Sequence, residues 1–280
     1  MRICTLALLF AAVITSAGCN HFSAHHADGH GHADGQGLGT PPAAQAPLTE
    51  VGIAVPIRSG QTEAWQQAIT ELTGPRYDEY ESSRQRMGIT SQTTFLQKTR
   101  MGDFAVIHMT GPDVRATFHA MAESRDPWDV KWRVLTESLH GIDFAKGEAV
   151  MPTIELAFET SSEQAATNRP YMFMAPIADL TAFRTLASEI KGGKRSAYLE
   201  SRQRLGIRRE AVYLETTGMG NAMVVYWDAP APQTSLAAMR ASTAPFDKWL
   251  LAGANNAHGM NLDELPVSHN PLVGQYPRGR

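Results

Sequence analysis

Apolar residues recur along the chain with two different periods, and these predict short strands and amphipathic helices from about residue 50 onward. The run VGIAVPI at residues 51–57 predicts a strand. A helix follows it, with Thr62 as the expected N-cap. This helix is expected to be interrupted at Gly74-Pro75 and to continue to Gly88. Its apolar positions lie at helical spacing: Trp65, Ala68, Ile69 and Leu72.

The next segments predict a hairpin, two more helices and a last strand. Residues 93–109 alternate on both sides of a turn at Gly102, which is typical of a β-hairpin. An amphipathic helix containing Phe118 follows, and another runs from near Pro127 to His140. The run PTIELAFE at residues 152–159 is expected to close this part of the chain. The resulting order, β-α-β-β-α-β, is that of ferredoxin-like modules.

The whole pattern of predicted elements occurs twice in the sequence. A shift of 118 positions places SRQRMGI, residues 83–89, on SRQRLGI, residues 201–207, without a gap. We therefore expect an α+β fold made of two tandem ferredoxin-like modules, residues 49–160 and 169–276, that form one pseudo-two-fold α+β barrel. Pairing within the chain would let a monomer bury both sheets. Identical residues related by the shift include Tyr80/Tyr198, Gly102/Gly220, Val106/Val224, Met121/Met239, Pro127/Pro245, Asp129/Asp247 and His140/His258.

This order, the module size and the duplication resemble the dimeric α+β barrel superfamily, in which two modules place their sheets face to face around a lumen. The superfamily includes antibiotic-biosynthesis-type monooxygenases, and its fused relatives include chlorite dismutase-like haem proteins. The resemblance covers residues 51 to about 276 and rests on topology. It implies one functional hypothesis, an oxygenase-like or haem-dependent enzyme that uses the barrel lumen. Fold alone does not imply activity.

The repeated SRQR segment has a structural and a functional interpretation. Gly88 and Gly206 follow a helix directly, where a left-handed C′ position favours glycine. Arginines in the last turn stabilise the negative helix end. The alternative is that Arg84 and Arg202 reach into the barrel and bind an anionic group through their guanidinium forks.

Two histidines, His140 and His258, also occupy equivalent positions, each before a glycine at an expected helix end. A helix cap or a buried structural histidine is one interpretation. The other makes them ligand-binding groups, metal ligands or general bases near the lumen. Asp129 and Asp247 follow prolines in expected first helical turns, where a carboxylate suits the helix dipole.

Positions at which the two copies differ are candidates for specialisation. His108 corresponds to Tyr226, Gln97 to Glu215, and Met109 to Trp227. If the face of His108 lines the lumen, His108 and Tyr226 are the candidate catalytic pair, for haem ligation or for acid–base work. The alternative is a strand histidine with ordinary hydrogen bonds.

The N-terminal residues predict a secretory signal at 1–18, because Arg2 precedes a short apolar run and small residues. The segment SAGC resembles the lipobox of bacterial lipoproteins, which implies lipid on Cys19 and a lipid-anchored envelope protein, with Asn20 favouring the outer membrane. Ser16 stands where that motif has leucine, and the alternative is an ordinary signal peptide with an incidental cysteine. With Cys4 in the removed segment and Cys19 lipidated, no thiol remains for disulfides or thiolate metal sites.

Residues 19–48 are rich in Gly, Ala, Pro and His, which predicts a flexible linker. Clustered imidazoles can bind divalent Zn, Cu or Ni, so metal capture on this arm is one hypothesis and an incidental polar tether the other. The five histidines of this arm are His21, His25, His26, His30 and His32.

Charge and composition narrow the functional classes. The net charge of −3, without a basic stripe, argues against nucleic-acid binding. No strong catalytic motif is present in the sequence. The leading hypothesis is therefore a non-catalytic envelope protein that binds a small ligand or a metal, and whether it is an enzyme stays open. Besides the oxygenase-like enzyme, a structural or assembly lipoprotein with a filled barrel is the remaining alternative.

Overall fold

The computed structural model describes residues 47–144, 146, 152–161, 169–261 and 270–277. The expected signal segment, Cys19 and the five histidines of the linker lie outside these residues. No helix in the described ranges combines the length and the apolarity needed to cross a bilayer.

Both modules contain the elements that the sequence predicts. In the first, these are β1 (Glu50–Pro56), α1 (Thr62–Thr73), α2 (Tyr77–Arg86), β2 (Ser91–Thr99), β3 (Gly102–Thr110), α3 (Val114–Glu123), α4 (Pro127–His140) and β4 (Thr153–Ser161). In the second, they are β5 (Pro170–Ile177), α5 (Leu180–Lys191), α6 (Arg195–Arg204), β6 (Arg209–Thr217), β7 (Gly220–Asp228), α7 (Pro232–Ala241), α8 (Pro245–His258) and β8 (Leu272–Tyr276).

The two modules exchange their last strands. The first sheet has the order β1-β3-β2-β8 and the second β4-β6-β7-β5, with antiparallel pairing throughout. The run at 152–159 is thus a strand, as predicted, but it joins the sheet of the other module instead of closing its own. We call β1–β3, α1–α4 and β8 the first half, and β5–β7, α5–α8 and β4 the second half.

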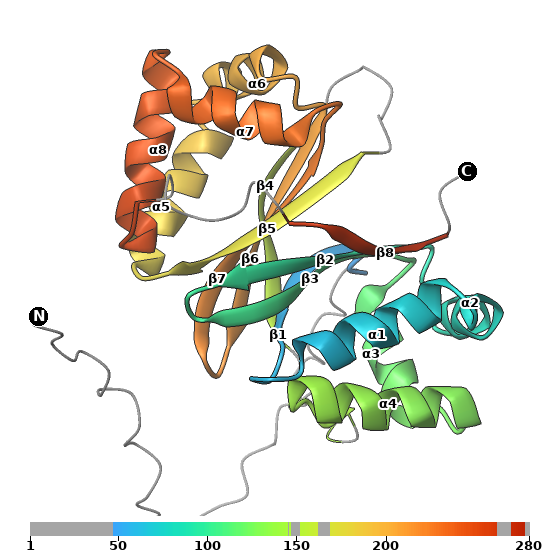
Figure 1. The fold of residues 1–280 in the computed structure, drawn as a ribbon. Helices are drawn as coiled ribbons and strands as arrows, with labels where there is room; N and C mark the ends of the chain where they lie inside the picture. Colours follow the sequence, from blue (N-terminus) through green and yellow to red (C-terminus); the bar gives the residue numbers. More distant parts are fainter. Residues whose placement is uncertain (1–46, 145, 147–151, 162–168, 262–269, 278–280) are drawn as a thin grey trace, which may run out of the picture. The chain divides into compact units, whose positions relative to one another are not determined.

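The sheets face each other, and each half carries its helices on the outer side of its own sheet (Figure 1). Contacts are reciprocal, because β1 meets β6 and β7 while β5 meets β2 and β3. The fold is therefore the predicted pseudo-symmetric α+β arrangement of two sheets.

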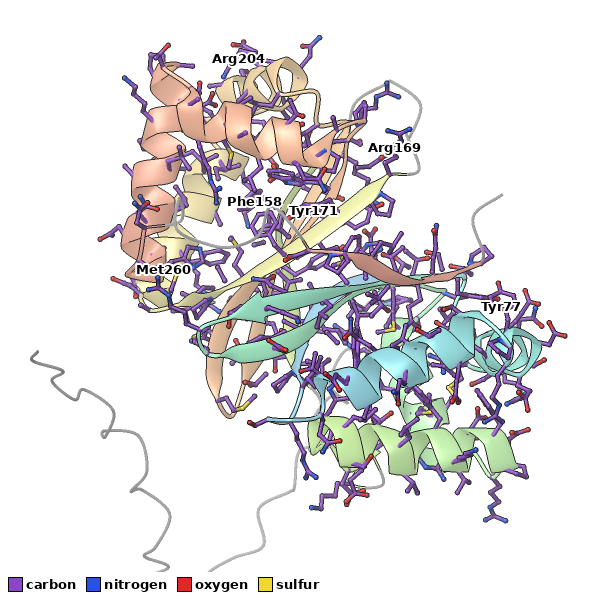
Figure 2. The ribbon with its side chains drawn as sticks, in the orientation of Figure 1. Tyr77, Phe158, Arg169, Tyr171, Arg204 and Met260 are labelled. Atoms are coloured by element: carbon purple, nitrogen blue, oxygen red, sulfur yellow. The ribbon has the colours of Figure 1, made fainter. Side chains whose placement is uncertain are left out.

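Packed side chains fill the space between the sheets (Figure 2). Ala54, Phe95 and Val106 of the first half share one buried cluster with Tyr213 and Val224 of the second. At Gly52 the second sheet comes so close that an added Cβ would lie 2.6 Å from the Tyr213 ring. The region expected to be a lumen is thus a core between the sheets.

The helix ends test the expected caps. Thr62 is the first helical residue and its hydroxyl donates to Asp103, at 2.7 Å, so the prediction that it caps α1 is wrong. In the second module Asp179 is the N-cap of α5, and its side chain accepts a 2.9 Å bond from the backbone N–H of Ala182. Both long helices break at their glycines, which separates α1 from α2 and α5 from α6.

The repeated SRQR segment ends its helix as the glycine pattern predicts. Gly88 and Gly206 both have a φ of 70°, a left-handed conformation that favours glycine. The backbone N–H of Ile89 returns to the carbonyl of Arg84 at 2.9 Å, as in a Schellman motif. This cap leaves the arginine side chains free for other contacts.

Candidate functional site

The first half encloses a cavity of about 350 Å³ between its sheet and the helices α1, α3 and α4. This volume lies within the range of small-molecule sites, about 300–1,000 Å³. The turn between β6 and β7 of the second half forms part of its rim, through Thr217, Gly218 and Met219. We call it the first-half cavity. Most of its wall is apolar and aromatic, including Trp65, Ile107, Met109, Phe118, Met121 and Trp132.

Arg84 brings a buried cation to this wall. Its side chain is 5% exposed, and its Nη atoms donate to Gln92 Oε1 at 3.1 Å and to Ser83 Oγ at 3.2 Å. The buried Nε has no hydrogen-bond partner among the described residues. Burial lowers the pKa of Arg84, although an arginine keeps its charge in proteins.

The nearby carboxylate of Asp129 attracts the charge of Arg84, although no hydrogen bond or ion pair joins the two side chains in the described part of the chain. Its oxygens accept hydrogen bonds from the hydroxyls of Ser83 and Ser124, at 2.6 and 2.7 Å. Asp129 also forms an ion pair with Arg86, at 3.1 Å. The helix-dipole role expected for Asp129 is thus combined with a buried network that joins α2 to α4. Arg84 and Arg86 point to different places, as their helical spacing predicts, and Arg84 is left with neutral partners in the described part of the chain.

His140 lies on the same cavity wall, at the end of α4. Its Nδ1 is 2.8 Å from the carbonyl oxygen of Pro56. Since a carbonyl only accepts, Nδ1 carries the hydrogen and Nε2 carries the lone pair of the neutral ring. Burial lowers the pKa of His140, so the ring is neutral near pH 7. It combines the predicted helix-cap position with a place in the cavity.

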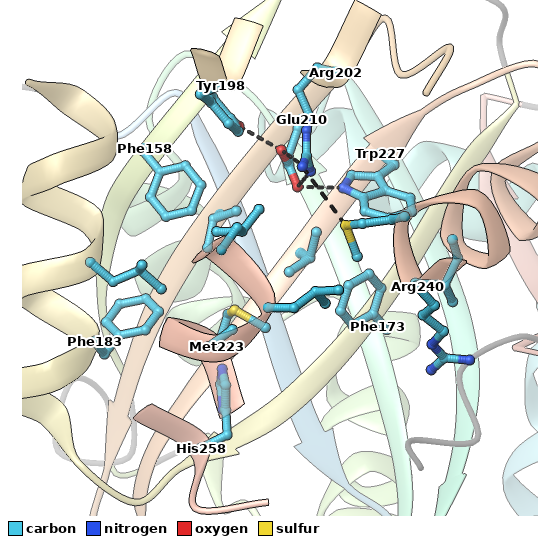
Figure 3. A pocket seen from close by; sticks show the side chains of 18 residues that line it. Phe158, Phe173, Phe183, Tyr198, Arg202, Glu210, Met223, Trp227, Arg240 and His258 are labelled. Carbon is cyan, nitrogen blue, oxygen red and sulfur yellow. Dashed lines mark hydrogen bonds and ion pairs between the residues drawn. The ribbon is translucent and has the colours of Figure 1, made fainter. Parts of the chain in front are cut away.

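The equivalent pocket of the second half is nearly closed. Its volume is about 70 Å³, and Arg202 forms an ion pair of 3.1 Å with Glu210. Glu210 also accepts hydrogen bonds from Tyr198 OH at 2.5 Å and Trp227 Nε1 at 2.6 Å (Figure 3). The buried cation of this half therefore has an internal counterion.

Substitutions between the copies explain why one pocket is open and the other filled. Glu210 corresponds to Gln92, which accepts from Arg84 but carries no charge. The bulky Trp227 and Phe173 correspond to Met109 and Val55. Met109 and Val55 both line the first-half cavity. Smaller side chains thus open the first half, and one amide in place of a carboxylate leaves Arg84 without an ion pair to any described residue.

His258 repeats the geometry of His140 within the filled pocket. Its Nδ1 is 2.5 Å from the carbonyl oxygen of Pro176, and burial lowers its pKa. Its buried Nε2 has no hydrogen-bond partner in the described ranges. In the close view it lies on the opposite side of the pocket from Glu210 (Figure 3).

The two residues singled out as a catalytic pair, His108 and Tyr226, lie between the sheets instead. His108 Nε2 donates to Glu50 Oε1 at 2.5 Å, and its ring stacks on Tyr226. Glu50 also accepts from Tyr213 OH at 2.8 Å and pairs with Arg209. Glu50 therefore joins the two halves through a buried polar cluster.

The electrostatics of this cluster fix its charges. Burial would raise the pKa of Glu50, but the hydrogen bonds that His108 and Arg209 donate and the charge of Arg209 outweigh it and lower the pKa to about 2. Burial lowers the pKa of His108, so near pH 7 the neutral ring donates its Nε2–H to the carboxylate. With Nε2 engaged by Glu50 and one ring face covered by Tyr226, His108 does not fit the role of a haem ligand.

Among the residues that the structure describes, no group of three or more His, Cys, Asp or Glu side chains could hold a metal ion. Metal binding by the histidines of the linker concerns residues outside this range and stays a prediction.

Sequence reasoning identified Arg84, Arg202, His140 and His258, and the structure brings them together pairwise in two pockets. The sequence patterns did not point to Gln92, Glu210 or Glu50. The difference between Gln92 and Glu210 was visible in the repeat, eight residues after each arginine. Only the fold shows that each side chain bonds to its arginine.

No family model matches the chain, and no curated protein matches it. Among solved structures it is similar to an anthrone oxidase-like protein, with 14% identity and a TM-score of 0.46 over 82% of this chain and 96% of that one. It is also similar to a candidate monooxygenase from Fusobacterium nucleatum, with 10% identity and a TM-score of 0.40 over 76% and 88% of the two chains.

A third similar structure is a candidate monooxygenase from Lactobacillus acidophilus, with 11% identity and a TM-score of 0.39 over 81% of this chain and 98% of that chain. At such identities and scores, these likenesses say nothing about what this chain binds or does.

Proposed function

We propose that the protein binds a small, mainly apolar organic molecule with an acidic group, and that Arg84 holds this group in the first-half cavity. The observation that carries the proposal is the contrast between the halves. Arg202 has Glu210 as counterion in a filled pocket, whereas Arg84 has only neutral partners among the described residues beside a cavity of about 350 Å³.

Physical chemistry favours an anionic ligand there. A buried charge is costly unless it is paired, and Arg84 is 5% exposed with one N–H lacking a partner. A carboxylate or phenolate would supply the missing counterion and accept charge-assisted hydrogen bonds. The aromatic wall formed by Trp65, Phe118 and Trp132 would pack against the apolar body of the ligand.

Calorimetric titration with 2-naphthoate tests this proposal. We expect saturable binding of one molecule per chain, at least tenfold weaker in Gln92→Glu, because the new carboxylate would pair with Arg84 as Glu210 pairs with Arg202. Glu210→Gln, in the other half, is the matched control and should bind like the wild type. Equal affinity for 2-naphthoate and neutral 2-naphthamide, or unchanged binding in Gln92→Glu, would contradict the proposal.

An oxygenase-like enzyme is a second candidate, favoured by the position of His140 in the same cavity. Its neutral Nε2 could take a proton from a bound phenol or enol while Arg84 stabilises the resulting anion. Oxygen uptake with hydroxyaromatic compounds, measured by electrode, tests this. Uptake that His140→Gln leaves unchanged would exclude His140 as the base.

We further propose that lipid on Cys19 attaches the protein to the bacterial envelope, most simply at the outer membrane. The support is the sequence of residues 1–20. Metabolic labelling with an alkyne-bearing palmitate analogue should label the wild type and not Cys19→Ser. Equal labelling of both proteins would contradict the anchor.

A further inference from the structure

The first-half cavity contains a second ionisable group, which is contributed by the second half. Glu215 lines the cavity although its strand β6 belongs to the second sheet. Its Oε2 accepts a 2.9 Å hydrogen bond from the backbone N–H of Ala54 in β1. Because β1 is an edge strand, its outer side has backbone groups available for such a contact.

Glu215 is a buried carboxyl group without a cation beside it. Its side chain is 3% exposed, and no ion pair joins it to another described residue. Burial raises its pKa to about 7, against the opposing effect of the Ala54 hydrogen bond. The cavity wall thus combines a cation and an acid whose hydrogen-bond partners, among the residues that the structure describes, are all neutral.

These two groups lie at opposite sides of the cavity. Ala54 is paired with Val106 in β3, and Val106 with Phe95 in β2, while Gln92 lies three residues before Phe95. Strand and residue spacings in a sheet place the Cα atoms of Ala54 and Gln92 roughly 14 Å apart. Since the side chains of Arg84 and Glu215 reach the cavity from these two places, a ligand that meets both must be elongated.

The pocket of the second half has no such carboxyl group from the facing sheet among its described lining residues. The equivalent of Glu215 is Gln97, whose amide donates to the carbonyl of Met174 at 2.9 Å and accepts from the Met174 N–H at 2.8 Å. Asn270 also donates to it, at 3.2 Å. Gln97 is thus a neutral group that joins the sheets and has its main donor and acceptor occupied. Of the two equivalent positions, 97 and 215, the ionisable residue is Glu215, which lines the open first-half cavity.

We propose that Glu215 is a second binding group of the first-half cavity, which selects elongated aromatic acids with a hydrogen-bond donor, such as a hydroxyl, opposite the acidic group. This inference rests on the proposed function, because Arg84 holds the acidic end. The site is composite: the first half supplies the cation and the aromatic wall, and the second half supplies the acceptor for the distal hydroxyl.

Three probes of the same ring system test the inference by calorimetry on the full chain at pH 8, where the Glu215 carboxyl is mainly ionised. They are 2-naphthoate, 6-hydroxy-2-naphthoate and 6-methoxy-2-naphthoate. We expect the hydroxylated probe to bind about tenfold more tightly than the other two, as for a hydrogen bond to a charged acceptor. The methoxy compound has a similar size but cannot donate.

Glu215→Gln should remove this preference, so that the hydroxylated and the methoxylated probes bind with equal affinity, because the glutamine oxygen keeps the bond to Ala54 and its amide nitrogen only donates. Glu189→Gln, an exposed change on α5, is the control and should keep the preference. If the variant does not fold, the comparison of hydroxyl with methoxy in the wild type decides.

The outcomes separate the two proposals. Equal binding of all three probes, still weakened by Gln92→Glu, would overturn the role of Glu215 and leave the proposed function intact. A preference for the hydroxylated probe that persists in folded Glu215→Gln would also overturn it. Absence of saturable binding for all three probes would contradict the proposed function, and the role of Glu215 with it.

Discussion

His108 lies face to face with Tyr226, with ring centroids 4.1 Å apart and ring planes inclined by 23°. The two residues are also repeat equivalents, 118 positions apart. A pair of equivalent residues can touch in this way only if the pseudo-two-fold axis passes between them. The two copies therefore differ, histidine against tyrosine, at the symmetry axis itself. Because the first half has the histidine, its ring can donate a hydrogen bond from Nε2 to Glu50.

Acid should weaken the contact between the halves through Glu50. Its pKa is 4.5 for an unperturbed group and about 2 in the folded protein, so its stabilisation is fully present above pH 4.5 and is lost as pH falls toward 2. For this partly exposed group we expect a loss of about 2–3 kcal/mol in the free energy of unfolding. Urea titrations between pH 7 and 3 measure this.

The variant Glu50→Gln should flatten that acid dependence and lower the stability at pH 7, because Arg209 and Tyr213 lose the charged acceptor. Glu63→Gln, on α1, is the matched control and should keep the dependence. If the free energy of unfolding falls equally between pH 7 and 3 in Glu50→Gln and in the wild type, other carboxyl groups cause the loss.

Met109→Trp should fill the first-half cavity by recreating the residue found in the second half. The cavity has room for the larger ring, and Gln92 offers an acceptor to its N–H, as Glu210 does for Trp227. We expect the affinity for 2-naphthoate to fall at least tenfold while the melting temperature stays equal or rises. Unchanged affinity in the folded variant would place the ligand elsewhere.

Glu210→Gln should destabilise the second half. It removes the counterion of Arg202 and one charged acceptor of Tyr198 and Trp227, and breaking a buried ion pair costs about 3–5 kcal/mol. The glutamine keeps the shape, so a loss near the lower end of this range is expected in urea unfolding. Gln92→Glu, the reverse change, should be neutral or stabilising, and a loss of similar size there would contradict the assigned pairing.

Gly52→Ala should separate the sheets locally. The new Cβ would lie 2.6 Å from the Tyr213 ring, which is itself held by Glu50. Overpacking of this kind costs about 1–3 kcal/mol. Gly193→Ala is the control, since its Cβ would meet no atom within 4 Å. A smaller loss of stability in Gly52→Ala than in Gly193→Ala would show that the sheets tolerate the extra methyl group.

The sequence predicted the secondary structure well because each pattern occurs twice, and a period seen in both copies is rarely accidental. It did not predict the partners of the last strands. The apolar alternation of residues 152–159 favours a strand but is equally compatible with either sheet. The gapless repeat also made each module look closed on itself.

The candidate site was predictable only in part, for a related reason. The sequence around Arg84 predicted a helix end capped at Gly88, and the structure contains that cap. The second property of Arg84, its place beside a cavity with neutral partners, depends on Gln92, Met109 and Glu215, which come from three strands and both halves. Such a combination arises from topology, which local patterns do not contain.

The two modules are repeats in sequence, but the exchange of β4 and β8 means that they are not separable units in the fold. The first sheet can be completed only after residues 272–276 have been synthesised, because β8 is its fourth strand. Meanwhile β4 remains unpaired until β6 follows it. Deleting either copy would therefore leave the remaining sheet without the fourth strand that it takes from the other module.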